Sequence, residues 1–157
     1  DILLLFPGFA FFAAGLGAFL LGHWCYLVVL LSGTGALRGW KEILCLMVPL
    51  VLAPVIVGLF GVEWPFSAAV AVYAFTLMMI AAGGVLWKLR GVGFAWRIFW
   101  GGIIFMISDS LIALKSFAGI DFALRNALIM PTYLLAEWLL VSGMLRGKLL
   151  VSGGSSR

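Results

Sequence analysis

The sequence predicts an all-α fold, a polytopic bundle of transmembrane helices, and three observations support this class. Of the 157 residues, 65% are hydrophobic and only 10% are charged, whereas a soluble domain is about half apolar and about a quarter charged. The mean hydropathy is +1.23. Apolar runs of roughly 20 residues, the length that crosses a bilayer core of about 30 Å, follow one another along the chain. This composition excludes a soluble enzyme and a disordered chain.

Five complete spans are expected, separated by short connections that contain charge, Gly or Pro. They cover residues 9–31, 42–60, 65–87, 95–114 and 124–145. Pro49 and Pro54 are expected to kink the second span, and Pro65 suits the first helical position of the third. The runs are apolar on all sides, so they do not match the alternating pattern of a transmembrane β-barrel.

The two ends of the chain are expected to differ from the spans. Asp1–Phe6, which stops at Pro7, has the pattern of the last part of a helix, so we expect further residues upstream. The C-terminal residues 147–157 finish in Ser-Gly-Gly-Ser-Ser-Arg, a composition typical of a flexible tail. One transmembrane domain over residues 1–146, followed by this tail, is therefore predicted.

The basic residues predict the orientation. Eight of them fall on one side of the predicted bundle, namely Arg38, Lys41, Lys88, Arg90, Arg97, Arg146, Lys148 and Arg157. The other side has only Lys115 and Arg125. An excess of Lys and Arg marks cytoplasmic loops, so we expect a cytoplasmic C-terminus, in a bacterial inner membrane. Because these bases lie in short loops between spans, a nucleic acid partner is not expected.

Tryptophans are expected to form a belt at the two membrane interfaces, where indole rings are enriched. Trp40, Trp87 and Trp96 fall near the cytoplasmic ends of the spans, and Trp64 falls near the outer end.

Four ionisable residues lie at membrane depth, where each is a functional candidate because burial of a charge there is costly. They are Asp1, His23, Asp109 and Glu137. Asp1 lies six residues before the turn at Pro7, and Asp109 lies six residues before Lys115. Both carboxyl groups are then roughly 9 Å below the outer surface and could meet. Counted in the same way, His23 and Glu137 lie deeper.

Three further polar residues accompany these groups, two on a shared helical face and one as a direct neighbour. Tyr26 lies on the face of His23, Tyr133 lies one turn before Glu137, and Ser108 precedes Asp109. His23 and Glu137 also have a structural interpretation, as hydrogen-bonding residues of helix packing. No spacing of His and Cys residues indicates a metal site, and no cofactor motif is found. Ser108 and Ser110 lack the motif that accompanies a serine nucleophile.

The chemistry of two carboxyl groups at one depth follows from their low-dielectric surroundings. One of them is expected to stay protonated and to serve as an acid, while the other is ionised. Such a pair suits cleavage of an acid-labile C–O bond through an oxocarbenium-like cation. Lipid is the substrate available at that depth.

Four stretches together resemble the YhhN family of membrane proteins, whose characterised members are lysoplasmalogenases. They are Asp1-Ile-Leu-Leu, which is similar to the end of a Gly-Asp-x-x-Leu segment, GLGAFLLGHWCYLVVL (Gly15–Leu30), GGIIFMISDSLIAL (Gly101–Leu114) and PTYLLAEWLLVSG (Pro131–Gly143). The resemblance covers nearly the whole chain. It implies a fold of about eight spans, of which roughly the first two would precede this sequence.

The resemblance also implies an activity, the hydrolysis of the vinyl ether bond of lysoplasmalogens to a fatty aldehyde and a glycerophospho-headgroup. It implies catalytic roles for the aspartates that match Asp1 and Asp109. His23, Tyr26, Ser108, Tyr133 and Glu137 would then bind the substrate. Glu137 departs from the family, which often has Gln at this position.

The expected partners are a lysophospholipid substrate and membrane lipids, and the sequence leaves the oligomeric state open, a homo-oligomer included. A different function uses the same intramembrane acids as a proton relay, in a small lipid or proton-coupled membrane transporter. Aldehyde release separates the two functions. A purely structural membrane subunit would leave these acids unexplained.

Overall fold

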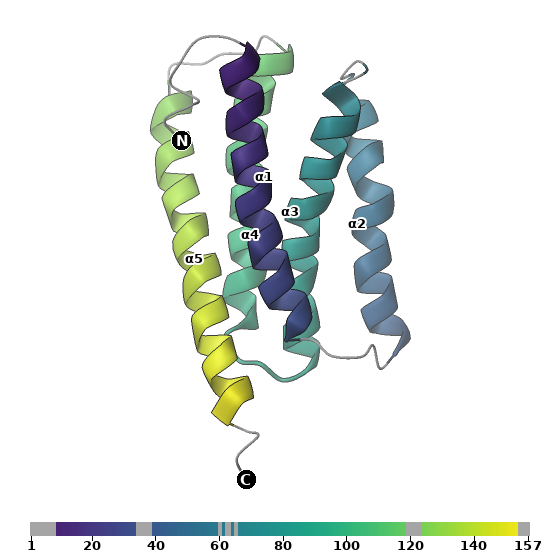
Figure 1. The fold of residues 1–157 in the computed structure, drawn as a ribbon, viewed down its shortest axis with the longest axis vertical. Helices are drawn as coiled ribbons and strands as arrows, with labels where there is room; N and C mark the ends of the chain where they lie inside the picture. Colours follow the sequence, from purple (N-terminus) through teal and green to yellow (C-terminus); the bar gives the residue numbers. More distant parts are fainter. Residues whose placement is uncertain are drawn as a thin grey trace.

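Five helices make up the described part of the computed structural model, which comprises residues 9–33, 39–59, 61, 64, 66–118 and 124–153. They are α1 (Phe9–Ser32), α2 (Trp40–Leu59), α3 (Phe66–Leu89), α4 (Ala95–Ala118) and α5 (Arg125–Gly153), and no strand occurs among these residues (Figure 1). Each helix is long and apolar enough to cross a membrane. The predicted fold class is confirmed.

The helix bounds agree with the predicted spans to within a few residues at most ends. Two helices are longer than expected: α4 continues to Ala118, and α5 continues to Gly153, into the stretch predicted as a flexible tail. Pro49 and Pro54 both lie inside α2. The predicted helix end at Asp1–Phe6 lies outside the described residues.

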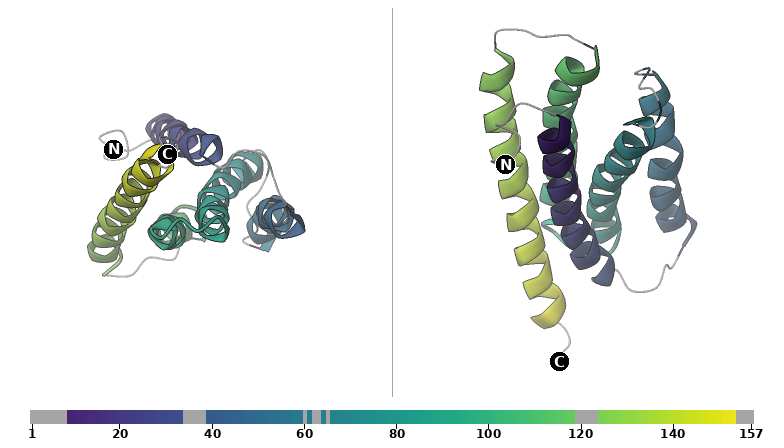
Figure 2. Two further views of the ribbon diagram at one scale, coloured as in Figure 1. Left: turned by 90° about the horizontal axis from the view of Figure 1, so that it is seen from below. Right: turned by 45° about the horizontal axis from the view of Figure 1, so that its top comes forward.

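Four helices, α1, α3, α4 and α5, surround a common interior, and α2 lies at the edge of the bundle (Figures 1 and 2). The helices that pack against each other are α5 with α4, α4 with α3, and α3 with both α1 and α2. The largest apolar side chains buried between them are Leu30, Leu77, Ile80, Leu86, Trp87, Ile98, Phe105 and Leu140. This core lies where the polar residues discussed below also meet.

Glycines allow α4 to approach both of its neighbours closely. A Cβ atom at Gly84 of α3 would lie 2.5 Å from the backbone nitrogen of Phe99 in α4. A Cβ atom at Gly101 of α4 would lie 3.1 Å from the carbonyl oxygen of Ala136 in α5. Small residues drive helix association in lipid because they permit extensive van der Waals contact. These two contacts therefore hold α3, α4 and α5 together.

The connection between α3 and α4 is a tight turn that also anchors α2. Gly91 has a φ of 82°, and the N–H of Val92 donates to the carbonyl oxygen of Trp87 over 3.0 Å, which is typical of a glycine-terminated helix. In this turn the Arg90 guanidinium donates to both carboxylate oxygens of Glu42, over 3.2 and 3.1 Å. The bidentate ion pair attaches the start of α2 to the rest of the bundle.

The tryptophan belt is only partly as predicted. Trp40, Trp64 and Trp96 are exposed on the outside of the bundle. Trp87 is only 1% exposed, and its indole N–H donates to the carbonyl oxygen of Leu30 over 3.0 Å. The expectation that Trp87 faces the membrane interface is therefore wrong, because this ring fills the space between α3 and the end of α1.

Candidate functional site

A group of polar side chains meets in the interior between α1, α3, α4 and α5. We call it the polar cluster and define it as His23, Tyr26, Tyr73, Asp109, Tyr133 and Glu137. It contains the chain's one histidine and all three of its tyrosines. Tyrosines of membrane proteins are usually enriched at the interfaces, so their collection in the interior, beside two acids, is unusual.

Two tyrosine–carboxyl hydrogen bonds form the frame of the polar cluster. The Tyr26 hydroxyl of α1 donates to Oε2 of Glu137 in α5 over 2.7 Å. The Tyr73 hydroxyl of α3 donates to Oδ2 of Asp109 in α4. Each bond joins two helices and partly compensates a carboxyl group for its lost hydration. All four helices of the bundle interior take part, because one bond joins α1 to α5 and the other joins α3 to α4.

His23 lies between these two pairs. Its ring centroid is 5.8 Å from that of Tyr26 and 6.1 Å from that of Tyr73, with both rings edge-on. The side chain is 2% exposed. The ring also packs edge-to-face on Phe105 of α4, at 4.4 Å between centroids.

The hydrogen bond of the His23 ring determines which nitrogen carries the proton. Nδ1 lies 2.7 Å from the carbonyl oxygen of Phe19, and since a carbonyl only accepts, Nδ1 is the donor. In the neutral ring Nε2 is then an acceptor with a free lone pair. Nε2 is buried and has no partner among the described residues. A buried, unsatisfied acceptor calls for a donor from a water or a ligand.

Aromatic rings enclose the polar cluster on the side of α4 and α5. Phe19 of α1 meets Phe105 at 6.3 Å and Tyr133 at 5.9 Å, and Phe105 meets Tyr133 at 5.5 Å, all edge-to-face. Such contacts fix ring orientation. Aromatic rings therefore make up much of the surface around the polar groups.

The comparison with known families gives a match over most of the chain. The model of the YhhN family matches residues 1–144. The chain belongs to the YhhN family. No curated protein and no solved structure matches it. All six members of the polar cluster lie within the matched range, so the cluster is part of the YhhN region of this chain rather than of its C-terminal extension.

The structure brings together five of the seven residues that the sequence indicated in this YhhN chain: His23, Tyr26, Asp109, Tyr133 and Glu137. The sixth, Ser108, is fully buried, and its hydroxyl donates to the carbonyl oxygen of Ile129 over 3.2 Å. This bond directs Ser108 at the backbone of α5. The seventh, Asp1, lies outside the described residues, so its predicted meeting with Asp109 stays a prediction.

Tyr73 is the site residue that sequence reasoning missed. It lies in an apolar run of α3 without another ionisable residue nearby, and its role as partner of Asp109 depends on a contact across 36 positions. A signal was present nonetheless, since Tyr73 is the third tyrosine placed inside a span instead of at its end. Asp109 and Glu137 were predicted to lie at different depths. The ring of His23 bridges them, because it contacts the tyrosine partner of each acid.

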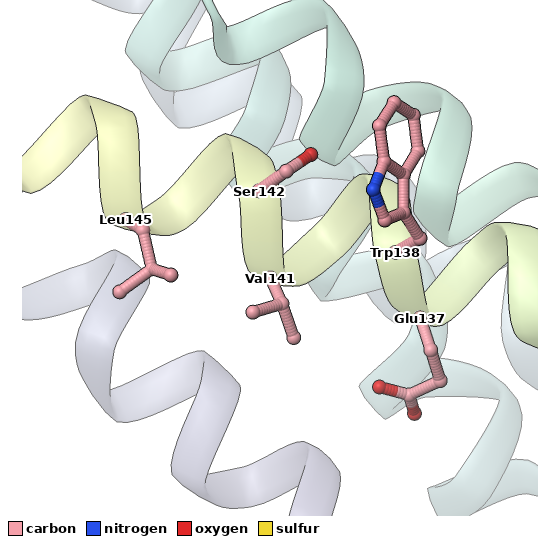
Figure 3. Close-up of a pocket in the computed structure, with 5 residues that line it drawn as sticks. All are labelled: Glu137, Trp138, Val141, Ser142 and Leu145. Carbon is pink, nitrogen blue, oxygen red and sulfur yellow. The ribbon is translucent and has the colours of Figure 1, made fainter.

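A shallow hollow of about 410 Å³ lies on a partly exposed face of α5 and reaches Glu137. Its lining consists of Glu137, Trp138, Val141, Ser142 and Leu145. Figure 3 shows the side chains of Glu137, Val141 and Leu145 on one side of α5 and those of Trp138 and Ser142 on the other. Glu137 therefore belongs to the polar cluster, through its bond with Tyr26, and also lines this hollow.

The described residues contain no group of three His, Cys, Asp or Glu side chains arranged as metal ligands. The polar cluster itself contributes two carboxyl groups, three phenols and one imidazole, which can donate, accept and hold protons.

Proposed function

We propose that this YhhN protein is a membrane-embedded hydrolase that cleaves the vinyl ether bond of lysoplasmalogens. The products would be a fatty aldehyde and a glycerophospho-headgroup. Membership of the YhhN family supports a hydrolase of this kind. The observation that carries the proposal is the polar cluster, in which two carboxyl groups, each hydrogen-bonded to a tyrosine, flank a buried imidazole with a free acceptor.

Asp109 is the proposed acid of the first step. Its protonated carboxyl transfers the proton to the outer vinyl carbon, and the electron pair of the double bond forms the new C–H bond. The resulting oxocarbenium ion is stabilised by a nearby carboxylate, the role we assign to Asp1. The Tyr73 hydroxyl donates to Oδ2 of Asp109, which stabilises the carboxylate that remains after the proton has left.

His23 is the proposed acceptor of the second step. Water attacks the cationic carbon, and its proton passes to the lone pair of Nε2, the acceptor that the Nδ1 bond to Phe19 leaves free. The hemiacetal then collapses as its C–O bond to glycerol breaks: protonated His23 gives its proton to the departing glycerol oxygen, and the hemiacetal hydroxyl gives its proton to the Asp109 carboxylate. The products are the aldehyde and the glycerol hydroxyl, and the acid is restored. Tyr26, Tyr133 and Glu137 line this space and would orient the water or the headgroup.

The proposed substrate is a lysophospholipid that reaches the site from the membrane. The basic residues of the sequence favour a cytoplasmic position for the end of α5 and fit a bacterial inner membrane. In this orientation the substrate glycerol would approach from the headgroup region of one leaflet, while its alkenyl chain stays in the hydrocarbon core.

The test measures fatty aldehyde release from a lysoplasmenyl phospholipid by the purified protein in detergent, with the saturated ether lipid as blank. Asp109→Asn keeps the shape of the side chain but carries no acidic proton, so we expect a loss of about 10²- to 10⁴-fold. Ser110→Ala is the matched control, because Ser110 is exposed and its hydroxyl only donates to Met106 of its own helix. Elution profile and thermal transition verify folding of both variants.

Release that requires both the vinyl ether and Asp109 supports the hydrolase. Full activity of a folded Asp109→Asn variant would refute the scheme. If the unmodified protein, folded in detergent, releases no aldehyde, the hydrolase proposal is wrong and the transporter alternative gains support.

A further inference from the structure

Two arginines from different helices meet at the end of the bundle where α5 finishes. Arg97 lies in the first turn of α4, and Arg146 lies near the end of α5. The guanidinium carbon of Arg97 is 5.5 Å from the ring centroid of Phe94, and that of Arg146 is 5.1 Å from the same centroid. One phenyl ring thus carries two cations, and an anion that binds both of them would offset their mutual repulsion.

Arg97 is held in a defined position. Its guanidinium also lies 5.3 Å from the ring of Trp138 in α5, and its Nη1 donates to the hydroxyl of Ser142 over 3.3 Å. Stacking on aromatic rings leaves the edge of the guanidinium, with its remaining N–H donors, free for an anion. Arg146 is exposed and supplies the second charge.

The acids of the described residues do not neutralise this pair. Glu42 is ion-paired with Arg90, while Asp109 and Glu137 are bonded to tyrosines in the interior. Within the described part of the chain, neither Arg97 nor Arg146 has an ion pair with a carboxylate. Both guanidinium groups are therefore available to a ligand that has an anionic group.

An apolar surface continues from these arginines toward the middle of the membrane. Trp138 and Ser142, which contact Arg97, also line the hollow on α5. From Leu145 to Glu137 the hollow extends eight residues (Figure 3), or about 12 Å along the helix axis. Cations at one end of an apolar surface that runs along a membrane helix match the polarity of a phospholipid, with its phosphate at the interface and its chain directed inward.

We propose that Arg97 and Arg146 bind the phosphate of a phospholipid whose hydrocarbon chain lies in the hollow on α5. This site uses no residue of the polar cluster except Glu137 at its far end, and it does not depend on vinyl ether hydrolysis. The apolar hollow favours a lipid phosphate over free phosphate, because inorganic phosphate would leave that surface without an occupant.

The experiment measures quenching of tryptophan fluorescence in the detergent-solubilised protein as phosphatidylglycerol with brominated chains is added. Trp138 lines the hollow and reports on a chain within it, and Trp138→Phe identifies its share of the signal among the seven tryptophans. The double variant Arg97→Gln/Arg146→Gln is compared with Lys41→Gln/Lys88→Gln. This control also loses two positive charges, but from exposed lysines at other positions.

For the arginine variant we expect the apparent affinity to fall by at least about tenfold, as expected for the loss of two basic contacts to a lipid phosphate. The lysine control should change it less than about twofold. Brominated monoacylglycerol, which has a chain but no phosphate, should quench Trp138 weakly in every variant. Inorganic phosphate should compete poorly with the lipid.

Three results would overturn the proposal. Equal affinities of the arginine and lysine variants would show that only net charge matters. Efficient competition by inorganic phosphate would show a simple anion site. If the arginine variant does not fold, Val141→Phe tests the site without changing a charge or adding a tryptophan: it narrows the hollow, and unchanged quenching of Trp138 by the brominated lipid would contradict a chain at that position.

Discussion

Replacement of Gly84 by alanine should destabilise the bundle at the contact between α3 and α4. The added Cβ atom would lie 2.5 Å from the backbone nitrogen of Phe99, 2.9 Å from its Cα and 3.1 Å from the carbonyl oxygen of Ala95. All three are backbone atoms, which cannot turn away as a side chain can. Since non-bonded heavy atoms need about 3.5 Å, α3 and α4 would have to separate by about 1 Å.

The size of the effect follows from this separation. Overpacking of an interior costs about 1–3 kcal/mol. For a chain of this length that corresponds to a fall in Tm of roughly 2–12 °C. Because α3 carries Tyr73 and α4 carries Asp109, the same separation should weaken their hydrogen bond. The proposed release of aldehyde, measured at a temperature below the transition, should therefore fall as well.

The assay is a thermal transition in detergent, followed by loss of the monodisperse elution peak. Gly58→Ala in α2 is the matched control, because a Cβ atom there has no atom within 4 Å. Alanine is the better helix former by about 0.5–1 kcal/mol, so the Tm of this variant should stay equal or rise slightly. A Tm of Gly84→Ala equal to that of Gly58→Ala would refute the reasoning, since it would mean that the two helices do not pack as closely as described.

Three further predictions concern single hydrogen bonds and ion pairs. Tyr26→Phe removes the 2.7 Å hydrogen bond to Glu137 and leaves that carboxyl group without its donor. The Tm should therefore fall by an amount equivalent to about 1–3 kcal/mol. An unchanged Tm would mean that the Glu137 carboxyl finds another donor. Glu42→Gln breaks the bidentate pair with Arg90 and should make α2 more accessible to limited proteolysis at its N-terminal end, while aldehyde release, whose residues lie on other helices, should persist. His23→Phe keeps an aromatic ring in the contact with Phe105 but removes the Nε2 acceptor. Folding should be retained, while aldehyde release should fall by about 10²-fold or more. Full activity of this variant would exclude His23 as the proton acceptor.

The interior acids illustrate how far sequence reasoning extends in this protein. Asp109, Glu137 and His23 were identifiable because an ionisable group in an apolar run is conspicuous at any position of the chain. Their partners were less accessible. Tyr26 and Tyr133 could be assigned to the site through helical periodicity with His23 and Glu137, but Tyr73 had no such neighbour in sequence. Ser108 was assigned to the substrate because it precedes Asp109. Its hydroxyl donates to the carbonyl oxygen of Ile129 in α5, and its role toward a substrate stays a prediction.

The sequence by itself determined that the described part of this chain is a bundle of five helices long and apolar enough to cross a membrane, approximately where each helix lies, and which polar residues fall within these helices. These properties depend on the composition of about 20 consecutive residues, because the transfer of each span into lipid is governed by its own side chains. Only the tertiary structure decided that Tyr73 bonds to Asp109, that Tyr26 bonds to Glu137 across 111 positions, and that His23 presents a free Nε2 between them. The physical reason is that these contacts arise from helix packing, where close approach at Gly84 and Gly101 sets which faces meet, and no local pattern of residues encodes that choice.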